Sequence, residues 1–206
     1  MIEVTVPVSH LKALRMHSAN SDVRYYLNGI YFDIANGKLV ATDGHRMLLV
    51  GTTAKHGNFI APNNFIDNII KACKGRHAPE LVEIHFECDK MECKVGDSTF
   101  RANAIDGKFP EYWRVIPESL SGEVSYINYE YLYDAAEALA LIDGAKKQYA
   151  PTLVYNGTGA SIAYGANDTA LVVLMPIRVD VGFDRTNYAS EILNWAKNAN
   201  SVAVAA

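Results

Sequence analysis

Cysteine is scarce in this chain, and its few copies are not paired. Cys73, Cys88 and Cys93 stand among 206 residues without a Cys-x-x-Cys spacing. An odd number of unpaired cysteines fits neither a disulfide framework nor a zinc site, so we expect free thiols in a reducing compartment. The sequence also lacks any run of 18 apolar residues, and its first residues lack the basic and apolar regions of a signal peptide. We therefore expect a cytoplasmic protein with no membrane partner.

A strong positive charge is missing as well. The formal net charge is −4. Nucleic-acid-binding domains are usually basic, with a pI above about 9, so the overall charge argues against a general nucleic-acid binder. The acidic excess lies in one part of the chain: residues 1–118 carry 14 Lys and Arg against 14 Asp and Glu, and residues 119–206 carry 5 against 9. Any surface that meets phosphates is therefore expected in the first part.

Catalytic signatures are absent from the sequence. It has no His-Glu-x-x-His pair, no glycine-rich phosphate loop and no Gly-x-Ser-x-Gly elbow. His85 stands in an alternating apolar and polar stretch, which is typical of a structural histidine in a strand. We expect no catalytic residue, no metal and no cofactor, and hence a protein that is not an enzyme.

What the sequence does contain is a repeated order of strand, helix and three strands. The predicted strands are 2–8, 24–35, 38–42, the run ending at Val50, 58–61, 81–88, 91–96, 98–105, 123–127, 152–155, 160–164, 169–175, 178–183 and 201–206. The predicted helices are 10–17, 65–73, 129–142 and 188–197. Short connections between successive strands require antiparallel pairing. The pattern predicts an α+β fold with antiparallel sheets and helices on one face.

Two domains are expected, covering residues 1–118 and 119–206. The segment between them, from Asp106 to Pro117, contains turn formers together with Phe109, Tyr112 and Trp113. Aromatic side chains do not suit a free tether, so we expect this linker to pack on the first domain.

The turn at Thr42-Asp43-Gly44 lies between two apolar runs. Asp-Gly in this setting is a strong hairpin signal, because glycine readily takes the positive φ of a tight turn. His45 and Arg46 follow directly, where strand formers are more usual. Taken alone, these two side chains are also explained as turn residues that bond to the local backbone.

Three stretches resemble the middle domain of the bacterial DNA polymerase III β subunit, the sliding-clamp family. They are Arg-Tyr-Tyr-Leu-Asn-Gly at 24–29, Ala-Thr-Asp-Gly-His-Arg at 41–46 and Phe-Pro-Glu-Tyr at 109–112. The three occur in the family's order over about 90 residues, as the count along the chain shows. The resemblance implies a DNA clamp fold of repeated β-α-β-β-β units and a non-enzymatic role as a replication scaffold.

The resemblance also implies a groove for the clamp-binding peptides of polymerases. The matching positions are Leu27, Thr42, Gly44, His45, Arg46, Met47, Pro110, Arg114 and Val115. Met175, Pro176, Ile177 and Arg178 resemble the tail that ends bacterial clamps, and would complete the groove under that alignment. The helix count favours a different alignment, in which the Leu193 helix belongs to a fourth repeat, so the place of this tail stays open.

Duplex DNA is the second partner that the resemblance implies, because clamp helices face DNA phosphates inside a ring. The matching residues are Lys12, Arg15, Arg24, Tyr25, Lys71, Lys74 and Arg76. The cations on the helices are also typical of a solvated helical face. Arg24 and Tyr25 are also explained as strand residues that pack in a core. The 129–142 helix has three acidic residues and no cation, which departs from an evenly basic lining.

Two functional hypotheses remain open. The first is a clamp-like accessory protein of DNA replication that associates with DNA and recruits a polymerase, with homo-oligomers forming the ring. The second is a monomeric clamp-fold module that binds clamp-binding peptides or regulates a clamp without encircling DNA.

Overall fold

The computed structural model describes residues 2–53, 57–145, 149–166, 169–178 and 185–198. The chain divides into two compact units, Met1–Pro176 and Ile177–Ala206. Within the described residues, none of the helices has the length and apolar character needed to cross a membrane. The second unit contributes α4 (Arg185–Asn198), and all the strands described lie in the first unit.

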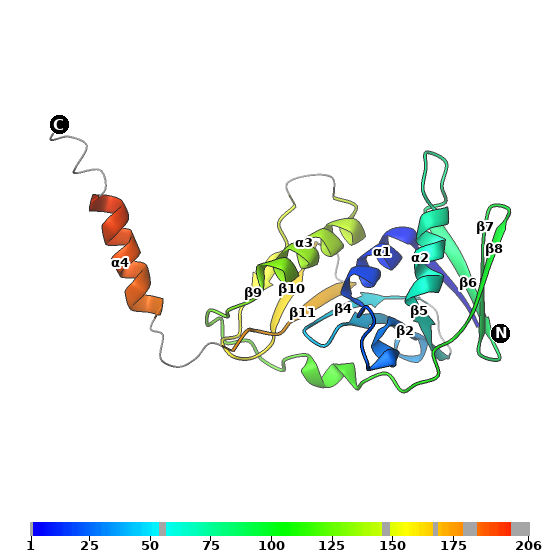
Figure 1. The fold of residues 1–206 in the computed structure, drawn as a ribbon, viewed down its shortest axis with the longest axis horizontal. Helices are drawn as coiled ribbons and strands as arrows, with labels where there is room; N and C mark the ends of the chain where they lie inside the picture. The colour runs from blue at the N-terminus through cyan, green and yellow to red at the C-terminus, as the bar shows by residue number, and fades with distance from the viewer. Residues whose placement is uncertain (1, 54–56, 146–148, 167–168, 179–184, 199–206) are drawn as a thin grey trace. The chain divides into compact units, whose positions relative to one another are not determined.

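Three repeats of strand, helix and strands follow one another in the first unit (Figure 1). The first contains β1 (Ile2–Pro7), α1 (Val8–His17), β2 (Gly29–Asp33), β3 (Lys38–Thr42) and β4 (Arg46–Gly51). The second contains β5 (Asn58–Pro62), α2 (Asn63–Ala72), β6 (Leu81–Glu87), β7 (Lys90–Val95) and β8 (Ser98–Asn103). The third contains α3 (Tyr129–Asp143), β9 (Thr152–Val154), β10 (Ser161–Tyr164) and β11 (Ala170–Leu174). Short 3-10 turns lie at Tyr25–Leu27, Ile34–Asn36 and Tyr112–Val115.

The strands form two antiparallel sheets. One has the order β1-β6-β7-β8, and the other has the order β5-β2-β3-β4-β11-β10-β9. The first two repeats therefore exchange their opening strands, since β1 joins the sheet of the second repeat and β5 joins that of the first. The third repeat extends the larger sheet through pairing of β11 with β4. Figure 1 shows α1, α2 and α3 along one side of the sheets, as the sequence predicts.

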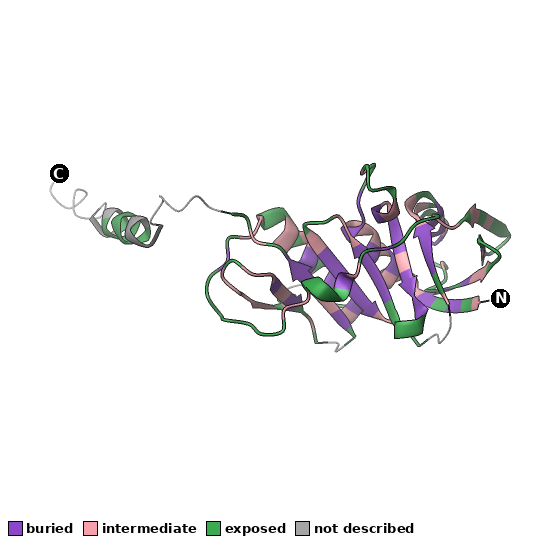
Figure 2. Ribbon diagram, turned by 90° about the horizontal axis from the view of Figure 1, so that it is seen from below, coloured by how far each residue is buried: buried purple, intermediate pink, exposed green. Residues whose placement is uncertain are grey.

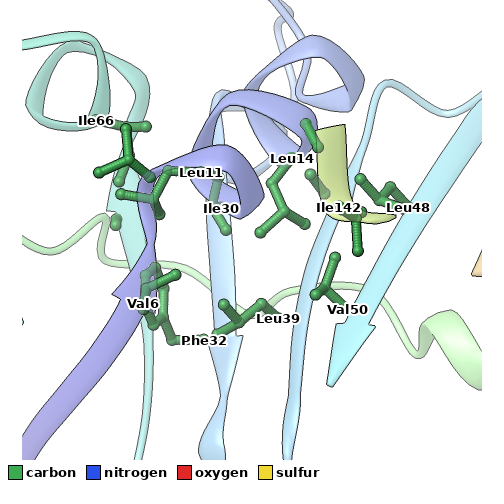
Figure 3. Close-up of a cluster of buried hydrophobic side chains, with 14 of the residues drawn as sticks. Val6, Leu11, Leu14, Ile30, Phe32, Leu39, Leu48, Val50, Ile66 and Ile142 are labelled. Carbon is green, nitrogen blue, oxygen red and sulfur yellow. The ribbon is translucent and has the colours of Figure 1, made fainter. Parts of the chain in front are cut away.

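One core lies between the helices and the sheets. Leu14 of α1 lies among side chains of the large sheet, such as Ile30 and Leu48, and Ile142 of α3, and Leu11 lies toward Ile66 of α2 (Figure 3). Figure 2 shows that the central strands carry most of the buried residues. A second, smaller cluster covers the opposite face of β3 and β4, which explains why these strands read as nearly continuous apolar runs. It consists of Ala19, Leu27, Val40, Met47, Leu49, Ile60, Phe109, Tyr112 and Val173.

The linker supplies part of that second cluster, so the predicted packing of its aromatic residues is confirmed for two of them. Phe109 stacks on Tyr31 with ring centroids 4.7 Å apart. The buried Tyr112 hydroxyl donates to Asp33 Oδ2 at 2.7 Å. Burial and this carboxylate together raise the pKa of Tyr112. Trp113 instead is 55% exposed.

Two predicted strands differ in the structure. The stretch 24–35 begins with a 3-10 turn and becomes a strand only at Gly29. The reason is local: Asp22 accepts from the Arg24 backbone N–H, and the Asn28 side chain bonds both the N–H and the C=O of Asp22, which closes a loop before the ladder begins. The stretch 123–127 has no regular structure. Single bonds hold it beside β9 and β10: the Gly157 N–H donates to the Glu123 carbonyl at 2.8 Å, and the Ser161 hydroxyl donates to Ser125 Oγ at 2.9 Å.

The four predicted helices are confirmed as α1 to α4, with bounds that differ by a few residues. The predicted strands at 178–183 and 201–206 fall on residues 179–184 and 199–206, outside the described residues. The boundary between two clamp-type domains near residue 118 stays a prediction. The larger sheet continues from β4 to β11 across that point in the sequence.

Candidate functional site

The hairpin between β3 and β4 is held by side chains that bond to its own backbone. Asp43 Oδ1 accepts the N–H groups of His45 and Arg46 at 2.8 and 3.0 Å. Thr42 Oγ1 accepts from the Gly44 N–H at 3.0 Å and donates to the Arg46 carbonyl at 2.7 Å. Gly44 has φ +92, so its predicted positive φ is confirmed. The turn is thus built locally, from residues adjacent in the sequence.

A cleft of about 200 Å³ opens beside this turn. It is smaller than the roughly 300–1,000 Å³ typical of small-molecule sites, and so suits one apolar side chain better than a whole ligand. Its lining residues are Arg24, Leu27, Thr42, Gly44, His45, Arg46, Met47, Pro110, Glu111, Tyr112, Val115, Val173 and Met175. Nine of the thirteen positions predicted for a peptide groove are among them.

The tail after β11 reaches the cleft because it continues alongside the hairpin. Leu174 pairs with Arg46, and the Met175 N–H donates to the His45 carbonyl at 2.9 Å. Met175 is 40% exposed on the wall of the cleft. Arg114 and Pro176 are not part of the lining. Ile177 and Arg178 begin the second unit, so their predicted role stays a prediction.

Arg46 faces the interior of the first unit as well as the cleft. Its guanidinium forms ion pairs with Asp43 and with Asp134 of α3, donates to the Met16 carbonyl at 3.0 Å, and lies 4.8 Å from the centre of the Tyr131 ring. The side chain is only 12% exposed. Arg46 therefore joins the hairpin to α1 and α3.

Met47 is buried, although a residue that contacts a peptide in a groove is expected to be exposed. It is 3% exposed and belongs to the second cluster, as does Leu27 at 2%. A charge at Met47 would destabilise the fold because an unpaired ion would be buried. The exposed large hydrophobic residues of the cleft are Val115, at 44%, and Met175; Pro110 is exposed beside them.

Four lining residues were not predicted for the groove. Arg24 was assigned to DNA; in the structure its guanidinium pairs with Asp22 at 2.7 Å and donates to the Asp43 carbonyl at 3.2 Å. The Arg24 side chain and the Arg24 backbone N–H both bond to the Asp22 carboxylate and lower its pKa to about 2. Glu111 and Tyr112 belong to the linker motif that signalled the site. Val173 becomes a lining residue only through the long-range pairing of β11 with β4.

The predicted DNA-binding cations divide into two groups. Lys71, Lys74 and Arg76 are exposed, and Lys12 is half-buried; in the described part of the chain none of them forms an ion pair. Arg15 instead pairs with Asp67 of α2 at 2.9 Å and donates to Asn20 Oδ1. Arg15 is therefore a link between α1 and α2. Tyr25 is 56% exposed on its 3-10 turn.

Two larger hollows lie in the first unit, and the second shares Pro110 and Glu111 with the cleft. One of about 840 Å³ is lined by strands β6 to β8, and one of about 1,120 Å³ by the linker with β5 and β8. Neither hollow is lined by the β3–β4 hairpin, and only the smaller cleft combines buried apolar residues with the polar residues of that hairpin.

Among the described residues, one group has the spacing of metal ligands: Glu3, Glu83 and His85 on β1 and β6. The His85 ring nitrogens lie 3.8 Å from the Glu3 carboxylate and 3.9 Å from that of Glu83. All three side chains are more than a third exposed. The geometry is that of a loose surface cluster of polar side chains, and we assign it no metal.

Comparison with known proteins gives one family. The model of the DNA polymerase III beta subunit, central domain, matches residues 4–111. The beta sliding clamp of Proteus mirabilis is 33% identical over 128 residues, covering 57% of this chain and 35% of that protein. The clamp of Escherichia coli K12 gives 33% identity over 128 residues, 57% of this chain and 34% of that protein. The match thus spans about a third of these relatives' length.

Solved structures give the same fold. A Pseudomonas aeruginosa DNA polymerase sliding clamp has a TM-score of 0.67 at 22% identity, covering 86% of this chain and 66% of that chain. The DNA polymerase III beta subunit of Thermotoga maritima has a TM-score of 0.66 at 14% identity, with coverage of 87% and 66%.

Proposed function

Since this chain belongs to the DNA polymerase III beta subunit family, we propose that it is a non-enzymatic accessory protein of DNA replication with a cleft for clamp-binding peptides. The observation that carries the proposal is the convergence of three distant segments on the 200 Å³ cleft. The hairpin, the linker and the tail after β11 each contribute to its lining. The relatives are described as sliding clamps, and a role in processivity comes to this chain from them.

The chemistry of the cleft suits a short peptide with a large apolar anchor. Leu27, Met47 and Val173 form an apolar floor that is already packed, so little ordering is needed on binding. Val115 and Met175 stand exposed at the wall, and methionine adapts to side chains of different shape. Polar groups at the rim are available to fix the peptide backbone, as in other apolar peptide grooves.

Peptide titration tests this proposal. A short peptide with a Gln and C-terminal Leu-Phe anchors should bind the wild-type protein with modest affinity. Val115→Asp and Met175→Asp should each weaken binding by about tenfold or more, because the anchor would desolvate a carboxylate. Fluorescence anisotropy of the labelled peptide gives the affinity.

Val23→Asp is the matched control, since Val23 is 96% exposed and is not part of the cleft lining. Its affinity should equal that of the wild type, and circular dichroism checks that all variants fold. Equal affinities for wild type and both cleft variants, or no binding to the wild type, would remove the cleft from this proposal.

Duplex DNA is the second proposed partner. Lys12 on α1 and Lys71 and Lys74 at the end of α2 offer cations without base-reading geometry, which suits weak contact with phosphates. The exposed Glu130 and Glu137 of α3 favour the alternative of a peptide-binding module that does not encircle DNA. A DNA-binding measurement, described in the Discussion, separates the two.

A further inference from the structure

The 1,120 Å³ hollow of the first unit adjoins the cleft. Pro110 and Glu111 line both spaces, and the turn that follows them, Tyr112–Val115, presents one exposed hydrophobic residue to each. Trp113 lines the hollow and is 55% exposed, whereas Val115 lines the cleft. The linker is therefore a partition between two neighbouring spaces, the cleft and what we call the linker hollow.

The partition is held in place by its own contacts. Tyr112 stands between the two exposed residues and is buried, with its hydroxyl bonded to Asp33. The Trp113 ring packs edge-to-face against the Tyr112 ring, with centroids 5.4 Å apart. The Glu111 carboxylate pairs with Arg114 at 2.7 Å within the same turn. Trp113 is thus exposed but already positioned, so contact with a ligand requires little ordering of the protein.

Aromatic side chains also form the floor of the linker hollow. Phe59 and Phe86 stack with ring centroids 4.4 Å apart, Tyr31 stacks on Phe109, and all four belong to the lining. An exposed tryptophan beside such a floor is typical of the residues that contribute most of the energy at an interface. The volume is slightly above the roughly 300–1,000 Å³ of small-molecule sites, which leaves room for several residues of a chain.

The charges around the linker hollow nearly cancel. Its lining contains two lysines and three acidic residues, Lys90, Lys108, Asp89, Asp106 and Glu111. Glu111 is also the partner of Arg114, which brings the local charge to balance. A balanced surface attracts neither phosphates nor a strongly basic segment. The hollow therefore suits an uncharged side chain, and its floor suits an aromatic one.

We propose that the linker hollow binds the same partner chain whose anchors occupy the cleft, and takes an aromatic side chain that follows those anchors. The proposal rests on the proposed function, because the cleft must hold the anchors. The anchors are the C-terminal residues of the peptide described above, so residues added after them start inside the cleft. Four added residues reach at most roughly 13 Å in extended form, which suffices to cross a wall that both spaces share.

Extended peptides test the proposal. The clamp-binding peptide is prolonged at its C-terminus by Gly-Ser-Gly-Phe or by Gly-Ser-Gly-Ser. The phenylalanine form should bind the wild type about fivefold more tightly or better, because an aromatic contact with Trp113 is added to apolar burial. Trp113→Ser should remove this gain and leave the affinity for the unextended peptide unchanged. Tyr133→Ser, at a 67% exposed position in neither lining, is the matched control and should keep the gain.

Cys88 gives a second readout in the unaltered protein. It is exposed and lines the linker hollow, whereas Cys73 and Cys93 are buried, and burial raises the pKa of both buried thiols. A thiol reagent should therefore react first at Cys88. The phenylalanine peptide at saturation should slow this reaction severalfold, and the unextended peptide should leave its rate unchanged. Mass spectrometry identifies the modified cysteine and follows the rate.

The proposal is wrong, with the cleft left in place, if the two extended peptides bind equally or if the gain survives Trp113→Ser. An unchanged rate at Cys88 under the phenylalanine peptide also overturns it. The same four residues added at the N-terminus should give no gain, and an equal gain there would show unspecific apolar contact instead. If the unextended peptide does not bind, the proposed function fails and this proposal fails with it, so the unextended peptide distinguishes the two failures.

Discussion

Single residues decide how the β3–β4 hairpin presents the cleft. Gly44 combines φ +92 with close approach of Arg24, whose guanidinium nitrogens lie 2.9 Å from the place where a Cβ would be. Arg24 in turn is fixed by the ion pair with Asp22 and by the Asp43 carbonyl. Glycine at residue 44 therefore allows the positive φ of the turn and leaves room for the Arg24 guanidinium.

Gly44→Ala should destabilise the protein by about 1–3 kcal/mol, because alanine disfavours positive φ and the new methyl group displaces Arg24. Gly122→Ala is the matched control: Gly122 has φ +75, but nothing lies within 4 Å of the added Cβ. Gly122→Ala should lower the free energy of unfolding by only about 1 kcal/mol, the cost of placing alanine at positive φ. Urea unfolding gives the free energy of unfolding of both variants. If Gly44→Ala loses no more stability than Gly122→Ala, Arg24 moves aside without cost and the argument is wrong.

His17 makes the stability of the fold depend on pH. The side chain is fully buried, its Nδ1 lies 3.0 Å from the Ala13 carbonyl, and Nε2 has no partner within the described residues. Burial lowers the pKa of His17 from 6.5 to about 4, and the nearby Arg46 adds to this while Asp43 and Asp134 oppose it.

The neutral form is favoured in the folded state, so the unfolded chain takes up a proton first as the pH falls. Stability should be full above pH 6.5, decrease by up to about 3 kcal/mol between pH 6.5 and 4, and not decrease further from this group below pH 4. His17→Leu removes the titration. Unfolding free energies across this range should diverge for wild type and variant, and parallel curves would contradict the argument.

At the scale of elements, α3 is attached to the first two repeats through the hairpin. Arg46 pairs with Asp134, and His45 stacks on Tyr131 with ring centroids 6.2 Å apart. The sheet beneath is joined by β4 and β11. The third repeat thus packs on the hairpin that forms the cleft.

Asp134→Asn should destabilise the protein by about 1–2 kcal/mol, because the largely buried Arg46 loses its charged partner on α3 while Asp43 remains. Glu137→Gln on the exposed side of the same helix makes the same chemical change and should stay within about 0.5 kcal/mol of wild type. Thermal unfolding compares them. Equal losses would mean that the ion pair does not hold α3 in place.

At the scale of the whole molecule, the question is whether Lys12 of α1 and the two lysines at and after the end of α2, Lys71 and Lys74, contact DNA. Lys12→Glu, Lys71→Glu and Lys74→Glu together should abolish sequence-independent binding to duplex DNA, and wild-type affinity should fall steeply with salt because each phosphate contact releases counterions. Arg15 is left unchanged, since its reversal would break the ion pair with Asp67.

The matched control reverses Lys90, Lys94 and Lys108, three exposed cations on β7 and the linker, with the same change in net charge. Electrophoretic mobility shifts over a salt series should separate the two triple variants. Binding that survives the helix variant would place the DNA surface elsewhere, and no wild-type binding would favour the peptide-binding module.

The sequence by itself determined the elements that depend on neighbouring residues. The Asp-Gly turn, the four helices and most strands follow from local spacing, because glycine φ and apolar periodicity act over a few positions. The aromatic residues of the linker indicated that it packs on the protein, although not which strands it covers. The resemblance of the Thr42–Met47 and Phe109–Tyr112 stretches to the clamp family also indicated most of the residues that line the cleft.

Only the tertiary structure decided what depends on distant contacts. Met47 is buried and Val115 is exposed because the linker folds back over β3 and β4, which no local pattern encodes. Met175 and Val173 reach the cleft because β11 pairs with β4, more than 100 residues earlier in the chain. Residues 123–127 have the alternation of a strand, but in the structure single bonds hold them instead of a strand ladder. The Gly157 N–H donates to the Glu123 carbonyl, and the Ser161 hydroxyl of β10 donates to the buried Ser125 Oγ, contacts that no local pattern encodes.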